Sequence, residues 1–456
     1  MLLLSCTSEP EVENKPEEKS VGDASAERGG DGKDDLLGYG YDVTREYANA
    51  SSARFKIIDV DKFKGALVDQ YYEEFPWSQT FKEEFGENAK AFSLKLSSST
   101  TSTANFFFFS ISRTTTNTNT NNFDSRFIYG KYSLVVKQKR LRLDSSPSEL
   151  SANYLTNTFK QDILSKTPEQ IVTDYGTHVL LDIYTGARLD MLFQSETINT
   201  DKSSASRSGL KASVLGIFNV TTNNEVGIAD DKKNYAKKLF YNTRGGDVNK
   251  QLNGEVNLED KRVLLPIINF SSWQNSSTQA NSVLVDFGKT GLSLIYNFVT
   301  DPAKKQALKT YVDQYLIANS VNLFTTPTPT IVTNPFGIVN GNLVRNSSTN
   351  KYFLLFEGKL RSLNESNTNP ISNQMLGVGV IKSLTPTELT FCVMGEPLNP
   401  IRNLIKTPDG AFYFREGNTL RWISTPVVFT KYVFNANAAV NVPNLNGFIV
   451  GKPIVN

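Results

Sequence analysis

Polar and apolar residues alternate most regularly between Asp174 and Phe193, in the stretch DYGTHVLLDIYTGARLDMLF. A period of two residues is typical of a β-strand, and this one extends from His178 over about 17 residues, where about 5–6 is usual. The pattern predicts one long strand, and Gly186 in its middle indicates a bend or a close backbone approach. The apolar side consists of Val179, Leu181, Ile183, Ala187, Leu189, Met191 and Phe193.

Other elements follow from the same kind of pattern. Residues 127–143 (FIYGKYSLVVKQKRLRL) predict a second long strand, and residues 60–85 are mostly helical in pattern until Pro76 interrupts them. Helices are predicted to begin after Thr167 and Asp301, because each is a capping residue that is followed by proline at the first helical position. Together these elements predict an α+β fold.

The texture of the chain changes at two places. Residues 1–35 are charged, rich in Gly and Pro and free of aromatic residues, so we expect a flexible tether. The Thr/Pro-rich stretch FTTPTPTIVTNPFG marks the second change and a domain boundary. Residues 36–325 then form the main domain, and 326–456 a smaller β-rich domain. Within the latter, KYFLLFEGKLRSL (351–363) and AFYFREGNTLRWI (411–423) form a weak repeat, which indicates internal pseudo-symmetry.

Composition narrows the classes of function. The chain has 48 basic and 46 acidic residues and a net charge of +2, so its charge does not favour nucleic acid as a partner. Two cysteines and one histidine are too few for a cysteine zinc cluster or a multi-histidine metal site. No run of about 18 apolar residues predicts a transmembrane helix. We therefore expect no metal, no cofactor and no nucleic-acid partner.

The first residues, MLLLSC, resemble the end of a bacterial lipoprotein signal, in which a short apolar run precedes the cysteine that becomes lipidated. The charged start and most of the apolar region of such a signal are missing. We expect Cys6 to be the lipidation site of a longer precursor. A chance match on an ordinary frayed terminus is the alternative.

His178, the only histidine, invites a catalytic reading because a Ser-His-Asp triad needs just one. It lies at the start of the long strand, behind a short predicted helix and a glycine turn, where its ring could bond the helix end or a neighbouring strand. No G-x-S-x-G elbow or comparable nucleophile context occurs in the sequence. We therefore expect a structural role for His178, no catalytic residue, and a protein that is not an enzyme.

The stretch YGTH and the glycine that follows it resemble the signature of the membrane attack complex/perforin (MACPF) family, which ends in a Gly-Gly pair. Here the second glycine is replaced by Ala187. NTRGGD (242–247) resembles the glycine pair after the fourth core strand of the family, and SSWQNS, SLIYNFV and KTYVDQYL follow in the order of the family. The resemblance spans roughly residues 36–324. The matching signature residues are Tyr175, Gly176, Thr177, His178 and Gly186.

This resemblance implies a strongly bent, twisted four-stranded antiparallel sheet flanked by two helical clusters, with the small C-terminal all-β domain outside it. In pore-forming members the two clusters unravel into β-hairpins that join a large oligomeric barrel. The bent sheet has to flatten in that change, and Gly186, Gly245 and Gly246 are the expected hinges, because glycine absorbs changes in backbone angles. Ordinary turns or bulges are the alternative reading of these glycines.

By position, the first cluster should lie between a strand near Phe92–Leu96 and the strand that begins at Phe127, and the second between Thr197 and about Ala236. A switching segment has to satisfy helical and strand periods at once, and GLKASVLGIFNVTT in the second segment does so. The first segment is less regular, and core packing is the alternative for both. The candidate membrane-inserting residues are Phe106, Phe107, Phe108, Phe109, Leu210, Val214, Phe218 and Val220.

We expect a bacterial outer-membrane lipoprotein exposed at the surface, or a secreted protein, that oligomerises on a target membrane and perforates it. Its expected partners are membrane lipid, further copies of itself in the pore state, and a glycan or protein receptor of the C-terminal domain. A non-lytic adhesin or binding lipoprotein that retains the fold is the second hypothesis. A secreted hydrolase that uses His178 is the third.

Overall fold

The computed structural model describes residues 34–98, 122–220, 227–325, 336–363, 376–377, 379–398 and 404–455. Three predictions lie outside these residues: the lipidation of Cys6, the membrane-inserting run Phe106–Phe109, and the flexible tether over residues 1–35 except for its last two residues. Those two, Asp34 and Asp35, are buried and therefore belong to the folded domain. The predicted domain boundary also falls outside them, at residues 326–335.

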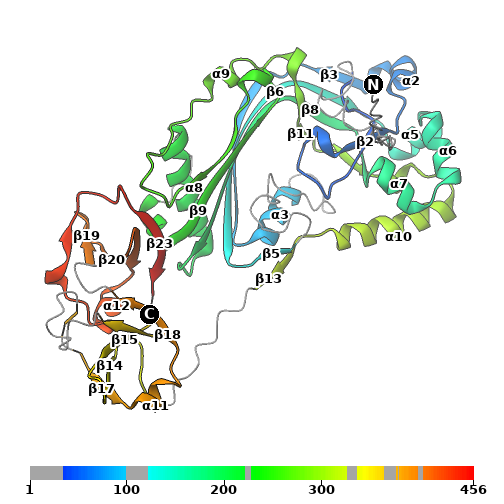
Figure 1. Ribbon diagram of the computed structural model, residues 1–456. Helices are drawn as coiled ribbons and strands as arrows, with labels where there is room; N and C mark the ends of the chain where they lie inside the picture. Colours follow the sequence, from blue (N-terminus) through cyan, green and yellow to red (C-terminus); the bar gives the residue numbers. More distant parts are fainter. Residues whose placement is uncertain are drawn as a thin grey trace, which may run out of the picture.

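Two long antiparallel strands form the centre of the main sheet, β6 (Phe127–Leu143) and β8 (Asp182–Thr197) (Figure 1). Strands β3 and β4 follow one another along the outer edge of β6, and β11 and β9 do the same along β8. The sheet is thus built on four antiparallel strands, as the family resemblance implies, with β10 added beside β9. The flanking strands are β3 (Tyr71–Glu74), β4 (Ser78–Gly86), β9 (Asn234–Arg244), β10 (Asn253–Asn257) and β11 (Val283–Phe287).

Both edges of this sheet change strands at the same height, which we call the bulge level and define by Gln138 and Gly186. Gln138 of β6 is a bulge, because the register with β8 passes over it. Gly186 is the last residue of β8 that pairs with β11, and Arg188 is the first that pairs with β9. On the other edge, residues 75–77 separate β3 from β4, and Pro76 among them has no N–H to donate.

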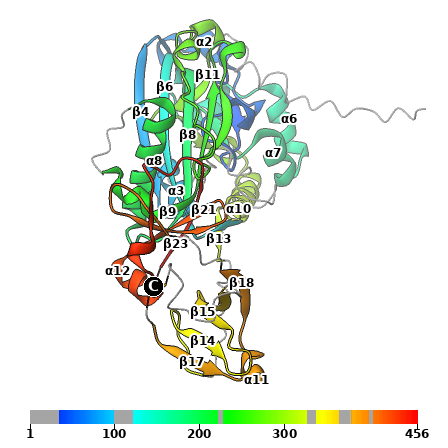
Figure 2. The same cartoon turned by 60° about the vertical axis from the view of Figure 1, so that its left-hand side comes forward.

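The alternation along β6 and β8 gives the sheet two different faces (Figures 1 and 2). Helix α8 (Lys202–Phe218) covers one of them, and helix α3 (Ala89–Ser98) packs on the other, where Phe92 meets Tyr129. We call these the α8 face and the α3 face. The buried side chains of β6 and β8 on the α8 face are Tyr132, Leu134, Val136, Ala187, Leu189, Met191 and Phe193.

Two predicted elements are wrong. Residues 60–85 contain one short α-helix, α2 (Val60–Ala66), and a 3₁₀ turn (Val68–Gln70), because pairing with β6 draws most of the rest into strands β3 and β4. Phe92 and Leu96 belong to helix α3 and not to a strand. They lie four residues apart and are both buried, and the Asn88 side chain accepts a hydrogen bond from the Ala91 N–H at 2.9 Å.

The long alternating strand is divided at Leu181. Strand β7 (His178–Leu180) pairs with β1 and β12 in a separate four-stranded sheet, whereas β8 enters the main sheet. Leu181 belongs to both environments, because its N–H donates to Gly291 at 2.9 Å and its carbonyl accepts from Leu143 at 2.8 Å. The alternation continues through this change of partners, so the sequence pattern does not reveal it.

Most of the remaining helices gather with this second sheet at one end of the molecule, away from α8 (Figure 1). The predicted starts after Thr167 and Asp301 are confirmed, since both side chains cap a helix that has proline in its first turn. The elements at this end are β1 (Tyr39–Tyr41), β2 (Ala53–Lys56), α5 (Pro147–Asn153), α6 (Asn157–Ser165), α7 (Pro168–Tyr175), β12 (Leu292–Leu294) and α10 (Pro302–Ala318). Helix α9 (Ser271–Gln274) and the parallel pair β5 (Asn122–Asp124) and β13 (Asn322–Phe324) lie elsewhere (Figure 1).

The C-terminal residues form two five-stranded sheets of the same design, and the predicted repeat is confirmed in their hairpins β15–β16 and β20–β21. Each sheet is an antiparallel meander of three strands with one parallel strand on either edge. The elements are β14 (Leu343–Asn346), β15 (Tyr352–Phe356), β16 (Lys359–Leu363), β17 (Ile381–Leu384), α11 (Pro386–Leu389), β18 (Met394–Leu398), β19 (Leu404–Lys406), β20 (Phe412–Glu416), β21 (Thr419–Ile423), α12 (Pro426–Lys431), β22 (Val440–Asn441) and β23 (Ile449–Ile454).

Two arginines at equivalent places tie these sheets together. Arg361 of β16 forms a salt bridge with Glu416 of the second sheet at 2.5 Å, and Arg421 of β21 binds Glu357 of the first sheet at 2.6 Å. Each arginine also donates through Nε to a carbonyl of the parallel strand beside it. The Leu-Arg pairs seen in the sequence repeat therefore have matching positions and matching contacts.

Replacing Arg421 by glutamine should lower the free energy of unfolding by about 1–3 kcal/mol, because Glu357 loses its partner and a carbonyl loses its donor. Urea unfolding followed by tryptophan fluorescence measures the loss, since Trp422 neighbours the site. Lys359→Gln makes the same charge change at an exposed position of β16 and should stay within about 0.5 kcal/mol. Equal losses in both variants would contradict the proposed tie.

Candidate functional site

Two of the glycines predicted as hinges touch at the bulge level. A Cβ added at Gly186 would lie 1.9 Å from the carbonyl oxygen of Val136, so β6 and β8 approach more closely there than a side chain permits. Gly245 follows β9 with a φ of 68°, and its added Cβ would lie 2.3 Å from the carbonyl oxygen of Gly186. Gly246 also has a positive φ, of 71°. The sequence thus located this contact, whereas the role of these glycines as hinges stays a prediction.

Residues 258–282, which we call the strap, cross the α8 face and bind the bulge level. The indole Nε1 of Trp273 donates to the carbonyl of Gly245 at 2.9 Å. The side-chain amide of Gln138, the bulged residue, donates to the carbonyl of Ser277 at 3.0 Å. Trp273 is fully buried among the apolar side chains of the α8 face. The strap therefore holds both the bulge of β6 and the glycine end of β9.

The strap also holds helix α8 and the edge strand β4. The Ile268 N–H donates to the carbonyl of Ile217, in the last turn of α8, at 2.7 Å. Further along, the amide of Gln274 donates to the side chain of Gln79 in β4 at 2.8 Å. One continuous segment thus connects α8, the bulge level and the free edge of the main sheet.

Helix α8 contains the predicted second membrane-inserting segment. Leu210, Val214 and Phe218 are buried on the α8 face, which confirms the predicted apolar side of the helix. Val220 lies half-buried beyond the helix end, where Asn219 has a left-handed backbone conformation with a φ of 53°. Insertion of these residues into a membrane stays a prediction.

The contact between α8 and the sheet is close but incompletely satisfied. A Cβ added at Gly209 of α8 would lie 2.2 Å from the ring of Phe193, so the helix backbone rests directly on the sheet. Ser195 of β8 and Ser208 of α8 are both 0% exposed, and neither hydroxyl has a hydrogen-bond partner among the described residues. A buried hydroxyl without a partner costs about 1–3 kcal/mol. The apolar burial of α8 is therefore partly offset at its own interface.

The signature residues join α7 to the second sheet. Gly176 ends α7 with a φ of 74°, and its added Cβ would lie 2.5 Å from the carbonyl carbon of Tyr41. The Thr177 N–H donates to the carbonyl of Tyr41 at 3.0 Å, and the Thr177 hydroxyl lies 3.0 Å from Nδ1 of His178. Tyr175 is fully buried behind them. These contacts fix the path from helix α7 into strand β7, as expected for His178.

A catalytic role for His178 has no geometric support. The side chain is 1% exposed, and burial lowers its pKa to about 3, so the ring is neutral at physiological pH. A ring enclosed to this degree offers no open side to a substrate. Within the described residues, no group of three or more His, Cys, Asp or Glu side chains is placed to hold a metal ion.

A buried ion network, which the sequence did not predict, lies on the α3 face. Arg188 donates through Nε to both carboxylate oxygens of Asp190, at 2.9 and 3.0 Å. Lys131 lies 3.2 Å and Arg244 3.4 Å from the same carboxylate. Burial alone raises the pKa of Asp190, but the three cations outweigh it and hold that pKa well below its usual range. The alternation of polar and apolar residues did place these charged residues on one face of the strands. The same alternation is expected when that face is exposed to solvent, so it does not reveal that the charges are buried.

Two other features of the site, the bulge at Gln138 and the strap, were also not predicted from the sequence. A bulge at Gln138 has no sequence signal, since a polar residue in a strand is usually an exposed one. The strap was noted only through the motif around Trp273.

The described helices include none that is long and apolar enough to cross a membrane.

Comparison with known proteins places these features in context. The MAC/Perforin domain family matches residues 32–323. A Bacteroides thetaiotaomicron protein described as a cell invasion protein with a MAC/Perforin domain is 14% identical, covers 92% of this chain and 95% of its own, and has a TM-score of 0.49. GNIP1Aa from Chromobacterium piscinae is 17% identical, with 63% of this chain and 57% of its own covered and a TM-score of 0.48. The search of curated proteins found no match.

His178 should make stability depend on pH. Between about pH 6.5 and pH 3 the unfolded chain protonates this ring and the folded chain does not. The free energy of unfolding therefore falls by about 1.4 kcal/mol per pH unit through this residue as the pH drops, and is unaffected by it above that range. His178→Gln removes this slope, so urea unfolding at several pH values should show the two proteins converging toward acid. Parallel curves would contradict the neutral, buried ring.

Trp273→Phe should lower the free energy of unfolding by about 1–3 kcal/mol, because the carbonyl of Gly245 loses its buried donor while the ring packing is kept. Hydrogen exchange should also quicken at Gly246, whose N–H donates to the strap at Asn281. Trp77→Phe, at a position that is 70% exposed, is the matched control and should change neither quantity. An unchanged exchange rate in the Trp273 variant would show that the strap does not hold the bulge level.

Proposed function

Because this chain belongs to the MAC/Perforin family, we propose that it oligomerises on a target membrane and perforates it with β-hairpins formed from its two helical segments. The second hairpin comes from helix α8 and the residues that follow it. The first comes from the predicted segment around Phe106–Phe109, which lies outside the described residues.

The interface of α8 is the observation that supports this proposal most directly. The helix rests on the sheet through Gly209 and Ser206, and among the described residues the buried hydroxyls of Ser195 in β8 and Ser208 in α8 have no hydrogen-bond partner. A helix that is needed only for packing would gain stability from apolar residues at those positions. Release into water gives these hydroxyls new partners, so the contact holds the helix less firmly than that of an ordinary core helix.

The residues of α8 also suit the strand that it would become. Leu210, Val214 and Phe218 share one side both of the helix and of an extended chain, which is what a lipid-facing strand requires. A membrane-spanning strand needs about 9–11 residues, and α8 together with the residues that follow it in sequence is long enough to supply such strands.

The sheet has to flatten before such hairpins extend, and the bulge level is the proposed hinge. Gly186, Gly245 and Gly246 absorb the change in backbone angles, and the strap has to leave Gly245 and Gln138 first. Ala187 stands where the family has its second glycine. Its side chain is buried on the α8 face and resists that movement more than glycine would.

The wider assignments follow from the same proposal. The protein would be a surface lipoprotein, through Cys6, or a secreted protein, monomeric in solution and oligomeric in the pore. Membrane lipid and further copies of the chain are its partners, and the C-terminal sheets carry a glycan or protein receptor site. The proposal assigns no enzymatic chemistry to the chain.

A disulfide between α8 and β6 tests the proposal. The hydroxyl oxygen of Ser206 lies 3.2 Å from the Cβ position of Gly130, so Gly130→Cys with Ser206→Cys is placed for a bond. The background is Cys6→Ser, Cys392→Ser. We expect the oxidised protein to release no dye from lipid vesicles and the reduced protein to release it, because only the latter can free α8.

The single-cysteine variants, oxidised in parallel, are the controls and should release dye as the background protein does. Equal release by the locked and reduced forms would show that α8 does not move. No release by any form, together with the absence of ring-shaped oligomers in electron micrographs, would favour the non-lytic adhesin.

A further inference from the structure

The C-terminal sheets meet the main domain through backbone hydrogen bonds at the start of the strap. The Val450 N–H donates to the carbonyl of Glu259, and Lys261 exchanges bonds with Phe448 and Gly447, all at 2.8 Å. Strand β23 thus extends the pairing at this joint, beside β9 (Figure 1). Residues 261–267 leave the joint and run toward α8.

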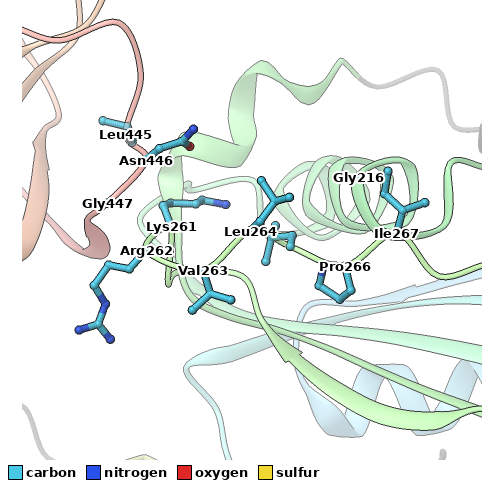
Figure 3. A pocket seen from close by; sticks show the side chains of 11 residues that line it. Gly216, Lys261, Arg262, Val263, Leu264, Pro266, Ile267, Leu445, Asn446 and Gly447 are labelled. Carbon is cyan, nitrogen blue, oxygen red and sulfur yellow. The ribbon is translucent and has the colours of Figure 1, made fainter.

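A cavity of about 940 Å³ opens at this joint (Figure 3). Its walls are the first half of the strap, Gly216 of α8, and residues 445–447 of the C-terminal sheets. Val263, Leu264 and Ile267 are 65%, 89% and 78% exposed, which is unusual for three aliphatic side chains within five residues. Exposed apolar surface that is gathered at a cavity indicates a binding site.

The cations at the mouth of this cavity differ from each other. Arg262 is already occupied, because it donates to both oxygens of Asp260 at 2.9 and 2.7 Å and points away from the apolar side chains (Figure 3). Lys261 extends toward Leu264 instead and forms no salt bridge with any residue that the structure describes. Burying a charge without a salt-bridge partner is unfavourable, so a bound anion beside Lys261 would be stabilising.

The nearest carboxylates do not satisfy Lys261. Asp231 is bonded to Lys237 at 2.8 Å, and burial raises the pKa of Glu259 to about 7, so its negative charge is only partial at neutral pH. Burial lowers the pKa of Lys261, with Lys237 adding repulsion. A bound anion beside Lys261 would favour the charged form of this lysine and so counteract both the burial and the repulsion that lower its pKa.

We propose that this cavity binds one anionic phospholipid of the target membrane, with an acyl chain along Val263, Leu264 and Ile267 and the headgroup phosphate at Lys261. The site rests on the membrane contact proposed above, and it adds the lipid class and the residues that recognise it. The lining that the structure describes is mostly aliphatic and contains no aromatic ring, which disfavours a sugar ligand. An exposed aliphatic segment beside a cation is what an anionic lipid surface attracts.

A lipid bound at this site would also act on the proposed hinge at the bulge level. The residues that hold the lipid belong to the strap, whose next contacts are Ile217 of α8 and Gly245 of the bulge level. Lipid binding would therefore pull on the segment that has to leave before the sheet flattens.

Sedimentation with phosphatidylcholine vesicles, with and without phosphatidylglycerol, tests the site. Phosphatidylglycerol should strengthen binding of the full chain to the vesicles. Lys261→Gln should lower the affinity for the vesicles that contain phosphatidylglycerol by about fivefold. Leu264→Ser should weaken binding to both vesicles by about tenfold, because a leucine is no longer buried in lipid. Lys261→Arg keeps the charge and should bind as the parent does.

Two matched controls carry the same changes elsewhere. Lys289→Gln removes an exposed lysine, and Leu164→Ser removes a leucine that is 71% exposed on α6. Neither should change binding. Losses of equal size in the controls, or unchanged binding of Lys261→Gln and Leu264→Ser, would overturn the lipid site.

Dye release measured on the same vesicles separates this inference from the proposed function. Normal binding and release by both cavity variants would overturn the lipid site and leave the pore standing. Lipid binding that depends on Lys261 and Leu264, without dye release by the parent, would support the site and count against the pore.

Discussion

The main sheet depends on a contact between backbones, not side chains. At the bulge level the carbonyl of Val136 occupies the space where a side chain of Gly186 would be, and the carbonyl of Gly186 does the same for Gly245. Three strands are thereby drawn together at one height, and both sheet edges change partners there because neither can continue through the bulge. A contact of this kind tolerates no Cβ, so the glycines follow from the geometry of the bend.

The two faces of the sheet meet this constraint with different chemistry. The α8 face is mainly apolar, with Gln138 at the bulge and Ser195 as buried polar residues, so the helix that covers it is held by packing and by the strap. The α3 face buries Asp190 among three cations close to the bulge level. Removing one member of such a network leaves uncompensated charge, which is strongly destabilising. The sheet thus has one face that is stabilised mainly by apolar packing and one that also depends on buried ion pairs.

The sequence predicted what is local and periodic. The capping residues Thr167 and Asp301, the apolar side of α8 and the signature turn at Gly176 all follow from short-range patterns that the fold retains. What failed depends on distant partners. Residues 71–86 become strands because β6 pairs with them, Phe92 joins a helix that covers Tyr129, and alternation passes unbroken through the change of sheet at Leu181. The strap could not be foreseen, because its hydrogen bonds join residues that are distant in sequence, 28 positions apart for Trp273 and Gly245 and 195 for Gln274 and Gln79.

The strap gives the C-terminal sheets a physical route to the hinge. Its first residues are paired with β23, its middle bonds the last turn of α8, and its later residues bond Gln138 and Gly245. On the proposed mechanism, a displacement at the joint would therefore be passed along one continuous segment to α8 and to the bulge level. In the proposed change, Gly186, Gly245 and Gly246 alone would leave the sheet free to flatten at any time. Their attachment to the strap would make flattening conditional on what the C-terminal sheets and the joint cavity bind.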